Sequence, residues 1–159
     1  MHKTAATDAY WREFRAAAGP DHDRYEVVAF GDSAEMASEL AELVVSGPKR
    51  ATAGLLRDFT LGGEPTPVVG DHVVMVDGRG LPRCIWRTTE VTVKPLIEVD
   101  AAFAWDEGEG DRTLADWLDG HRRYFRRQAE QQGFEFHDGL ETVFERFTVV
   151  WPPEVADRG

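Results

Sequence analysis

Residues 73–93, VVMVDGRGLPRCIWRTTEVTV, contain the pattern that decides the fold. Residues 73–76 are a short apolar run, residues 77–80 (DGRG) are typical of a turn, and apolar and polar side chains alternate over residues 84–93. Two such runs on either side of a glycine-containing turn predict a β-hairpin. We therefore expect the chain to be built on a sheet that contains antiparallel strands.

The residues before this hairpin predict a strand followed by a helix. Residues 25–30 form a short apolar run, after which Gly31 turns the chain. Asp32 and Glu35 have the spacing of a capping box, and apolar residues then recur on one stripe until Gly47. Glycine is the usual residue after the last turn of a helix. A helix is thus expected to end at Gly47.

The residues after the hairpin predict one further helix and one further strand. Over residues 113–131 the apolar and aromatic side chains recur on one face, and arginines lie on the other. Residues 142–151 read as a strand that ends at Pro152-Pro153, whereas residues 61–70 are rich in Gly and Pro and are expected to form a mobile loop. Four or five strands, several of them joined as hairpins, indicate an α+β fold with a small mixed sheet or a partly closed barrel.

The length of the chain and its helix start and stop signals predict one domain with a helical extension. The 159 residues, 42% of them hydrophobic, are enough for a single core. A first helix, capped by Thr7 and stopped by Gly19-Pro20, is expected to pack on the domain as an extension over residues 1–24. Residues 25–152 are expected to form the domain, and residues 153–159 a disordered tail.

The composition predicts a soluble cytoplasmic protein that does not bind polyanions indiscriminately. The formal net charge is -11 and the isoelectric point is about 4.8, so long-range electrostatics repel nucleic acid. Cys84 is the single cysteine, which excludes an intrachain disulfide, and we find no signal-peptide core or membrane-spanning apolar run. Zinc-type spacings, a phosphate-binding loop and a dinucleotide fingerprint are also missing, so no cofactor is expected.

Lys49 and Thr52 follow the end of the second helix and place an amine three residues before a hydroxyl. A desolvated lysine has a lowered pKa and can act as a base or nucleophile, whereas a solvated lysine remains a cation that binds phosphate or carboxylate. The alternative is that Lys49 only complements the dipole at the C-terminal end of the helix.

Glu107, Glu109 and Asp111 are separated by single glycines, which allow the backbone to aim their carboxylates into a cleft. Crowded carboxylates raise one another's pKa, which suits acid–base chemistry. The alternative is an acidic cap for the helix that follows. A divalent metal could bind these acids, although no defined ligand set is visible. We predict a polar cleft where Lys49 and Thr52 meet these acids.

Two other polar residues lie within apolar patterns and have competing interpretations. Glu145 either faces the interior and pairs with Lys49 or an arginine, or is solvated while Phe144 and Val150 point inward. His121 lies on the apolar face of its helix, where a hydrogen-bonded core histidine is more common than a catalytic one.

Basic and aromatic residues provide the candidates for contact with nucleic acid. The arginine face of the helix over residues 113–131 is either a solvated surface or the best local site for phosphates in so acidic a chain. The tryptophans are mostly core residues, but Trp105 lies beside the acidic loop and could stack on a base. The candidate contacts are Lys49, Arg50, Arg57, Trp105, Arg122 and Arg126.

The order of these motifs resembles the ASCH domain family, which is related in fold to the PUA RNA-binding barrel. The resemblance rests on residues 47–52 (GPKRAT, a Gly-x-Lys-x-x-Thr pattern), 69–71 (VGD), 107–114 (EGEGDRTL), Trp117, His121 and 145–147 (ERF). It covers residues 25–152 and is strongest to bacterial stand-alone members with an extra N-terminal helix. It implies a PUA-like barrel of mixed or antiparallel strands, flanked by helices, with a cleft lined by the Lys49 motif.

The resemblance implies that the partner is RNA or a modified nucleoside, and it leaves three functions open. Members of the family include a ribonuclease and an amidohydrolase that deacetylates acetylated cytidine, and others are thought only to bind RNA. In a ribonuclease, Lys49 and Arg50 would hold phosphate. The amidohydrolase pattern makes Lys49 the base, Thr52 the nucleophile and a glutamate the proton donor, for which this chain offers Glu107 or Glu109. The third function is a non-catalytic RNA-binding or regulatory module.

Overall fold

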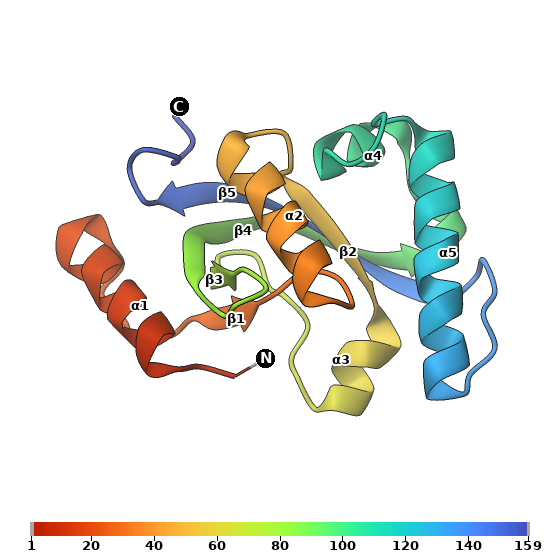
Figure 1. Ribbon diagram of the computed structural model, residues 1–159, viewed down its shortest axis with the longest axis horizontal. Helices are drawn as coiled ribbons and strands as arrows, with labels where there is room; N and C mark the ends of the chain where they lie inside the picture. Colours follow the sequence, from red (N-terminus) through yellow and green to blue (C-terminus); the bar gives the residue numbers. More distant parts are fainter. Residues whose placement is uncertain (1, 159) are drawn as a thin grey trace.

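The structure is a computed structural model that describes residues 2–158, apart from the side chain of Ala18. Strands and helices follow one another along the chain without a regular alternation (Figure 1). The elements are α1 (Ala5–Ala18), β1 (Glu26–Val28), α2 (Ala34–Ser46), β2 (Ala51–Leu55), α3 (Leu56–Gly62), β3 (His72–Val76), β4 (Pro82–Pro95), the short 3-10 helix η1 (Leu96–Glu98), α4 (Ala101–Glu107), α5 (Leu114–Gln132) and β5 (Glu141–Trp151).

The strands form one mixed sheet in the order β1-β3-β4-β5-β2. β1 runs parallel to β3, and all other neighbours are antiparallel. The pairing of β4 with β5 shifts register between Ile85 and Trp86 and again between Thr88 and Glu90. Such irregularities bend and twist a strand, and the sheet curls into a half-barrel (Figure 1). The predicted α+β class with a partly closed mixed barrel is therefore confirmed.

The hairpin predicted over residues 73–93 is formed by β3 and β4. Asp77 is buried in its turn, where Oδ1 accepts hydrogen bonds from two backbone N–H groups at 2.9 and 3.2 Å. The Gly78 N–H donates to Ser38 Oγ at 3.0 Å, and a Cβ on Gly78 would lie 1.9 Å from the carbonyl oxygen of Ala34. The turn needs glycine here because it docks directly onto the start of α2.

Helices cover both faces of this hairpin. Trp11 and Phe14 of α1 pack against Ile85 on one face, and Val44 of α2 packs in the cluster around Trp86 on the other. In Figure 1, α1 and α5 stand at opposite ends of the sheet. A third cluster lies between β5 and the helices α4 and α5; its largest members are Phe103, Trp117, Phe125 and Phe144. The helix α1 thus packs on the sheet through Trp11 and Phe14.

Two predicted helix caps are wrong by a few residues. Thr4, not Thr7, caps α1, because the two threonine side chains each accept from the other's backbone N–H in a reciprocal capping box. Ser33, not Asp32, caps α2, and its Oγ accepts from Met36 N at 3.1 Å. In both cases several residues with capping side chains lie next to one another, so sequence spacing does not decide between them.

Besides the short helix η1, three elements were not predicted from the sequence. The segment 51–62 contains both β2 and α3, so the loop expected from residue 61 starts after Gly62 instead. The acidic stretch that precedes α5 contains α4, whose apolar residues Phe103 and Ala104 are buried. Asp100 caps this short helix by accepting from Phe103 N at 2.8 Å.

The segment after β5 folds back onto the domain, which differs from the expected disordered tail. Asp157 accepts hydrogen bonds from Arg50, from Thr148 Oγ1 at 3.1 Å and from Val149 N at 2.9 Å. Residues 153–158 are thus held against β5; residue 159 lies outside the described residues. Among the described helices, none combines the length and apolar character needed to cross a membrane.

Candidate active site

Lys49 lies on the short connection between α2 and β2, and its side chain is only 1% exposed. Gly47 ends α2 with φ 119°, and the Lys49 N–H donates back to Leu43 O at 3.2 Å. The ammonium then lies 2.5 Å from Glu107 Oε2, 2.8 Å from Glu109 Oε2 and 2.9 Å from Ala51 O. These contacts use all three of its donors, so Lys49 is not a free cation.

The acidic loop reaches Lys49 because a glycine lets two backbone segments touch. Gly108 follows α4 with φ 69°, and a Cβ there would lie 2.5 Å from the carbonyl oxygen of Pro48. The Arg50 N–H donates to Asp106 O at 2.7 Å and ties the same two segments together. Glycine spacing therefore brings Glu107 and Glu109 beside a lysine about 60 residues earlier in the chain.

The two glutamates have pKa shifts of opposite sign. Burial raises the pKa of Glu107 well above its usual value, despite the opposing charge of Lys49. Burial also acts to raise the pKa of Glu109, but the Lys49 charge and the hydrogen bonds from Glu107 and Lys49 outweigh it and lower that pKa to about 2. For Lys49, burial acts to lower the pKa, but the two carboxyl groups hold it above its usual value. These directions favour the neutral form of Glu107, the ionised form of Glu109 and the ammonium form of Lys49.

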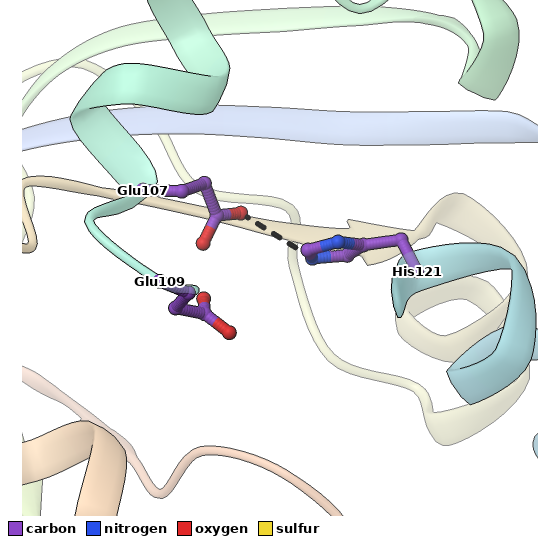
Figure 2. A group of neighbouring side chains, drawn as sticks. All are labelled: Glu107, Glu109 and His121. Carbon is purple, nitrogen blue, oxygen red and sulfur yellow. Dashed lines mark ion pairs between the residues drawn. The ribbon is translucent and has the colours of Figure 1, made fainter. Parts of the chain in front are cut away.

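His121 projects from α5 toward this cluster (Figure 2). Its Nδ1 lies 2.9 Å from Trp117 O, so Nδ1–H donates to that carbonyl and Nε2 presents a lone pair. Nε2 lies 3.6 Å from Glu107 Oε1, a buried oxygen that has no hydrogen-bond partner within residues 2–158. Burial lowers the pKa of His121, so the ring is neutral at neutral pH. An acid and a base therefore face each other here.

A cavity of about 470 Å³ opens beside these groups. Its polar lining includes Lys49, Thr52, Glu107, Glu109 and His121, and the aromatic rings of Phe30, Trp117 and Tyr124 complete much of its wall. This volume falls in the range of small-molecule sites, and the lining has the usual combination of aromatic surface and few converging polar groups. The arrangement suits proton transfer to and from a ligand of nucleoside size.

Comparison with known proteins gives the family. The family model described as "ASCH domain" matches residues 26–151, most of the chain. The chain belongs to the ASCH domain family. An ASCH domain from Lactobacillus crispatus is similar at 29% identity and TM-score 0.80, covering 89% of this chain and 92% of that chain. A protein from Enterococcus faecalis is similar at 34% identity and TM-score 0.81, covering 89% and 86%.

The resemblance seen in the sequence is thus confirmed. A hypothetical protein, PH0355, shares the fold at 12% identity and TM-score 0.51, with 79% of this chain and 98% of that chain covered. A search of curated proteins found no match.

This ASCH domain brings its four predicted catalytic candidates to one cavity. Lys49, Thr52, Glu107 and Glu109 all line it, whereas Asp111 is exposed and accepts from Thr113 at the start of α5. Both interpretations of the acidic loop therefore hold, each for different residues. His121, interpreted from the sequence as a core residue, is hydrogen-bonded but also lines the cavity. Its place beside Trp117 in the motif was the available signal.

Apart from Lys49, the predicted nucleic-acid contacts do not line this cavity. Arg50 donates to Asp157 and to two backbone carbonyls, Arg57 lies over the Phe134 ring at 3.6 Å, and Arg122 is bidentate on Asp138. Arg126 lies 5.1 Å from the Phe136 ring, and Trp105 is 57% exposed under the Arg112 guanidinium rather than in the core. Arg123 and Arg127 line the cavity instead, because they share a face of α5 with Asp116 and Gly120, which also line it.

Glu145 faces the interior, as one of the two interpretations held, but its predicted partner is wrong. It is 6% exposed, and its Oε2 accepts from Trp86 Nε1 at 3.1 Å and from Thr88 Oγ1 at 2.6 Å. Both donors belong to β4, which pairs with β5, and Lys49 is already bound to the acidic loop. Phe144 is also buried, since both faces of β5 are covered.

Glu107, Glu109 and His121 could each offer one ligand atom to a metal ion, and these atoms lie within 4.8 Å of one another (Figure 2). The Lys49 ammonium, however, already binds both carboxyl groups from within the cluster. A divalent ion would have to displace it or share the acids with it. The cluster therefore contains its own cation, and we assign no metal to it.

Proposed function

We propose that this ASCH domain is an amidohydrolase that acts on an uncharged, nucleoside-sized amide such as acetylated cytidine. The observation that carries the proposal is the pair of glutamates with opposed pKa shifts around one buried amine. Two titratable groups whose environments push their pKa values apart are typical of acid–base catalysis. The volume and aromatic walls of the cavity suit a flat ligand of this size.

The engagement of the cations argues against a phosphate at the same place. Lys49 is bonded to two carboxyl groups, and Arg50 is bonded to Asp157. A phosphate would also meet the ionised Glu109 in the cavity. An uncharged amide avoids this repulsion, and its carbonyl oxygen can approach the Lys49 ammonium.

The proposed reaction uses Thr52 as the nucleophile. Its Oγ1 attacks the amide carbon, His121 Nε2 accepts the hydroxyl proton, and the Lys49 ammonium stabilises the charge that develops on the carbonyl oxygen. Glu107 donates its proton to the nitrogen as the carbon–nitrogen bond breaks, which releases the amine and leaves an ester on Thr52. Because Lys49 retains its proton, His121 takes the role of base that the family resemblance would give to Lys49.

Water completes the cycle. The proton on His121 returns to Glu107, whose Oε1 lies 3.6 Å from Nε2. Water then attacks the ester, His121 accepts a proton from it, and that proton passes to Thr52 Oγ1 as the ester bond breaks. The net change is one amide plus one water giving an acid and an amine.

Glu107→Gln tests the proposal, because it preserves the shape of the side chain and removes the acid. We expect cytidine release from acetylated cytidine, followed by chromatography, to fall roughly 10²- to 10⁴-fold. Thr52→Ser should retain activity and Thr52→Ala should lose it. Glu141→Gln, an exposed change on β5, is the matched control and should leave the rate unchanged. A chelator should have no effect. Wild-type protein that releases no cytidine would refute the proposal.

A second candidate function is supported by the two arginines that line the same cavity. Arg123 and Arg127 could receive phosphates of a single-stranded RNA whose base enters the cavity. The protein is then incubated with single-stranded RNA, with and without magnesium, at several salt concentrations. Binding that weakens with salt and with Arg127→Ala, together with no release of cytidine, would favour this RNA-binding or ribonuclease function over the amidohydrolase.

A further inference from the structure

A second cavity, of about 250 Å³, adjoins the first and is not used by the reaction proposed above. Phe30, Gly31, Thr52, Ala53 and Tyr124 border both cavities. The rest of its wall comes from the helices α3 and α5, the loop that precedes β3 and all five strands of the sheet, with Glu145 contributed by β5. The two cavities are thus neighbouring parts of one concave region, and Thr52 stands between them.

The charge of the second cavity has a single sign. Its charged lining residues are Glu26, Asp58, Glu64, Asp71 and Glu145, and no lysine, arginine or histidine of the described chain joins them. Aromatic rings of Phe30, Phe59, Trp86, Tyr124 and Phe125 supply much of the remaining surface. Acidic groups above aromatic walls attract cations and repel anions.

Glu145 is the deepest of these acids and is prepared for a ligand. Trp86 Nε1 and Thr88 Oγ1 both donate to Oε2 and fix the orientation of the carboxyl group. Within residues 2–158, Oε1 receives no hydrogen bond, although the residue is only 6% exposed. Because Glu145 lines the cavity, Oε1 is free to accept a hydrogen bond from a ligand that carries an N–H donor.

We propose that the second cavity binds a planar organic cation with N–H donors, such as an amidinium, guanidinium or protonated aminopyrimidine, through Glu145. A planar group fits between the aromatic rings, and its N–H groups can reach Oε1. Thr52, the proposed nucleophile, borders both cavities, but this cation site does not depend on the proposed amidohydrolase function, whose substrate is uncharged.

Benzamidine is the probe, and benzamide is its uncharged counterpart of the same shape. The Trp86 indole N–H reports on the site because it donates to Glu145, and its NMR signal can be assigned with Trp86→Phe. We expect benzamidine to shift this signal saturably, benzamide to leave it in place, and Glu145→Gln to weaken binding at least tenfold. Glu141→Gln, an exposed change on the same strand, should bind benzamidine like wild type.

A second variant fills the cavity without altering Glu145. Gly54 lines the cavity, its φ is not positive, and an added Cβ would meet only Phe59, at an ordinary 3.7 Å. Gly54→Val should therefore fold and exclude benzamidine. Glu107→Gln should retain benzamidine binding, so this site and the proposed hydrolysis can fail separately. The inference is wrong if benzamidine leaves the Trp86 signal in place, if benzamide shifts it equally, or if Glu145→Gln binds as tightly as wild type.

Discussion

Glu107 and Glu109 are two residues apart and chemically identical, but their surroundings differ. Glu107 ends α4 inside the protein, with 1% of its side chain exposed, whereas 30% of the Glu109 side chain is exposed. Full burial favours the neutral form of Glu107, and partial exposure beside the Lys49 ammonium lets Glu109 remain ionised. Sequence spacing predicted that the acids would crowd together, but not which one keeps its proton, because that depends on burial by segments far along the chain.

The opposed shifts predict opposite pH dependences of stability. The folded protein holds a proton on Glu107 that the unfolded chain releases, so this residue lowers the free energy of unfolding as pH rises above 4.5. The stability advantage of Glu107→Gln over wild type should therefore increase with pH above that value.

Glu109 stabilises the fold above pH 4.5, and this contribution is lost as pH falls toward 2. The stability difference between wild type and Glu109→Gln should thus shrink over that range. Urea titrations at several pH values measure both trends, and parallel curves for the two variants would contradict them.

At the scale of elements, the helices and strands that could be predicted were those with clear start and stop signals in the sequence. The β3–β4 hairpin, α2, α5 and β5 have glycine, proline or capping signals and regular apolar spacing. By contrast, the Ala-Thr-Ala-Gly segment of β2 has few β-branched residues and is a strand because it pairs with β5. The short helix α4 lies within an acidic stretch and depends on its packing against β5 and α5.

Gly108 is where two of these elements must meet closely. Gly108→Ala would place a methyl group 2.5 Å from the Pro48 carbonyl oxygen and would strain a residue with φ 69°. We expect a loss of roughly 2 kcal/mol or more in unfolding free energy, together with loss of activity as the acids move away from Lys49. Gly133→Ala is the control: its φ is 74°, but a Cβ there would meet open space, so its loss should be limited to about 1 kcal/mol. Equal losses in thermal or urea unfolding would show that the close approach does not matter.

At the scale of the whole molecule, the net charge is -11, but many positive side chains are locally paired with acidic ones. Several cations are bound to acids of the chain's own surface, as Arg50, Arg122 and Arg146 illustrate. The predicted phosphate contacts stay predictions, since sequence shows which residues are basic but not which are already paired. The predicted meeting of Lys49 with the acidic loop succeeded because it followed the order of a family motif. The hydrogen bonds from Trp86 and Thr88 to Glu145 could not be predicted from the sequence, because they depend on the register between β4 and β5.

The central claim is that Glu107 favours its neutral form while Glu109, beside the same amine, favours its ionised form. The most direct test is a ¹³C NMR pH titration of the glutamate side-chain carboxyl carbons, with Glu107→Gln and Glu109→Gln used for assignment. We predict that the Glu107 carbon titrates well above 4.5 and that Glu109 titrates near 2. A Glu107 signal that titrates near 4.5, like an ordinary glutamate, would contradict the account.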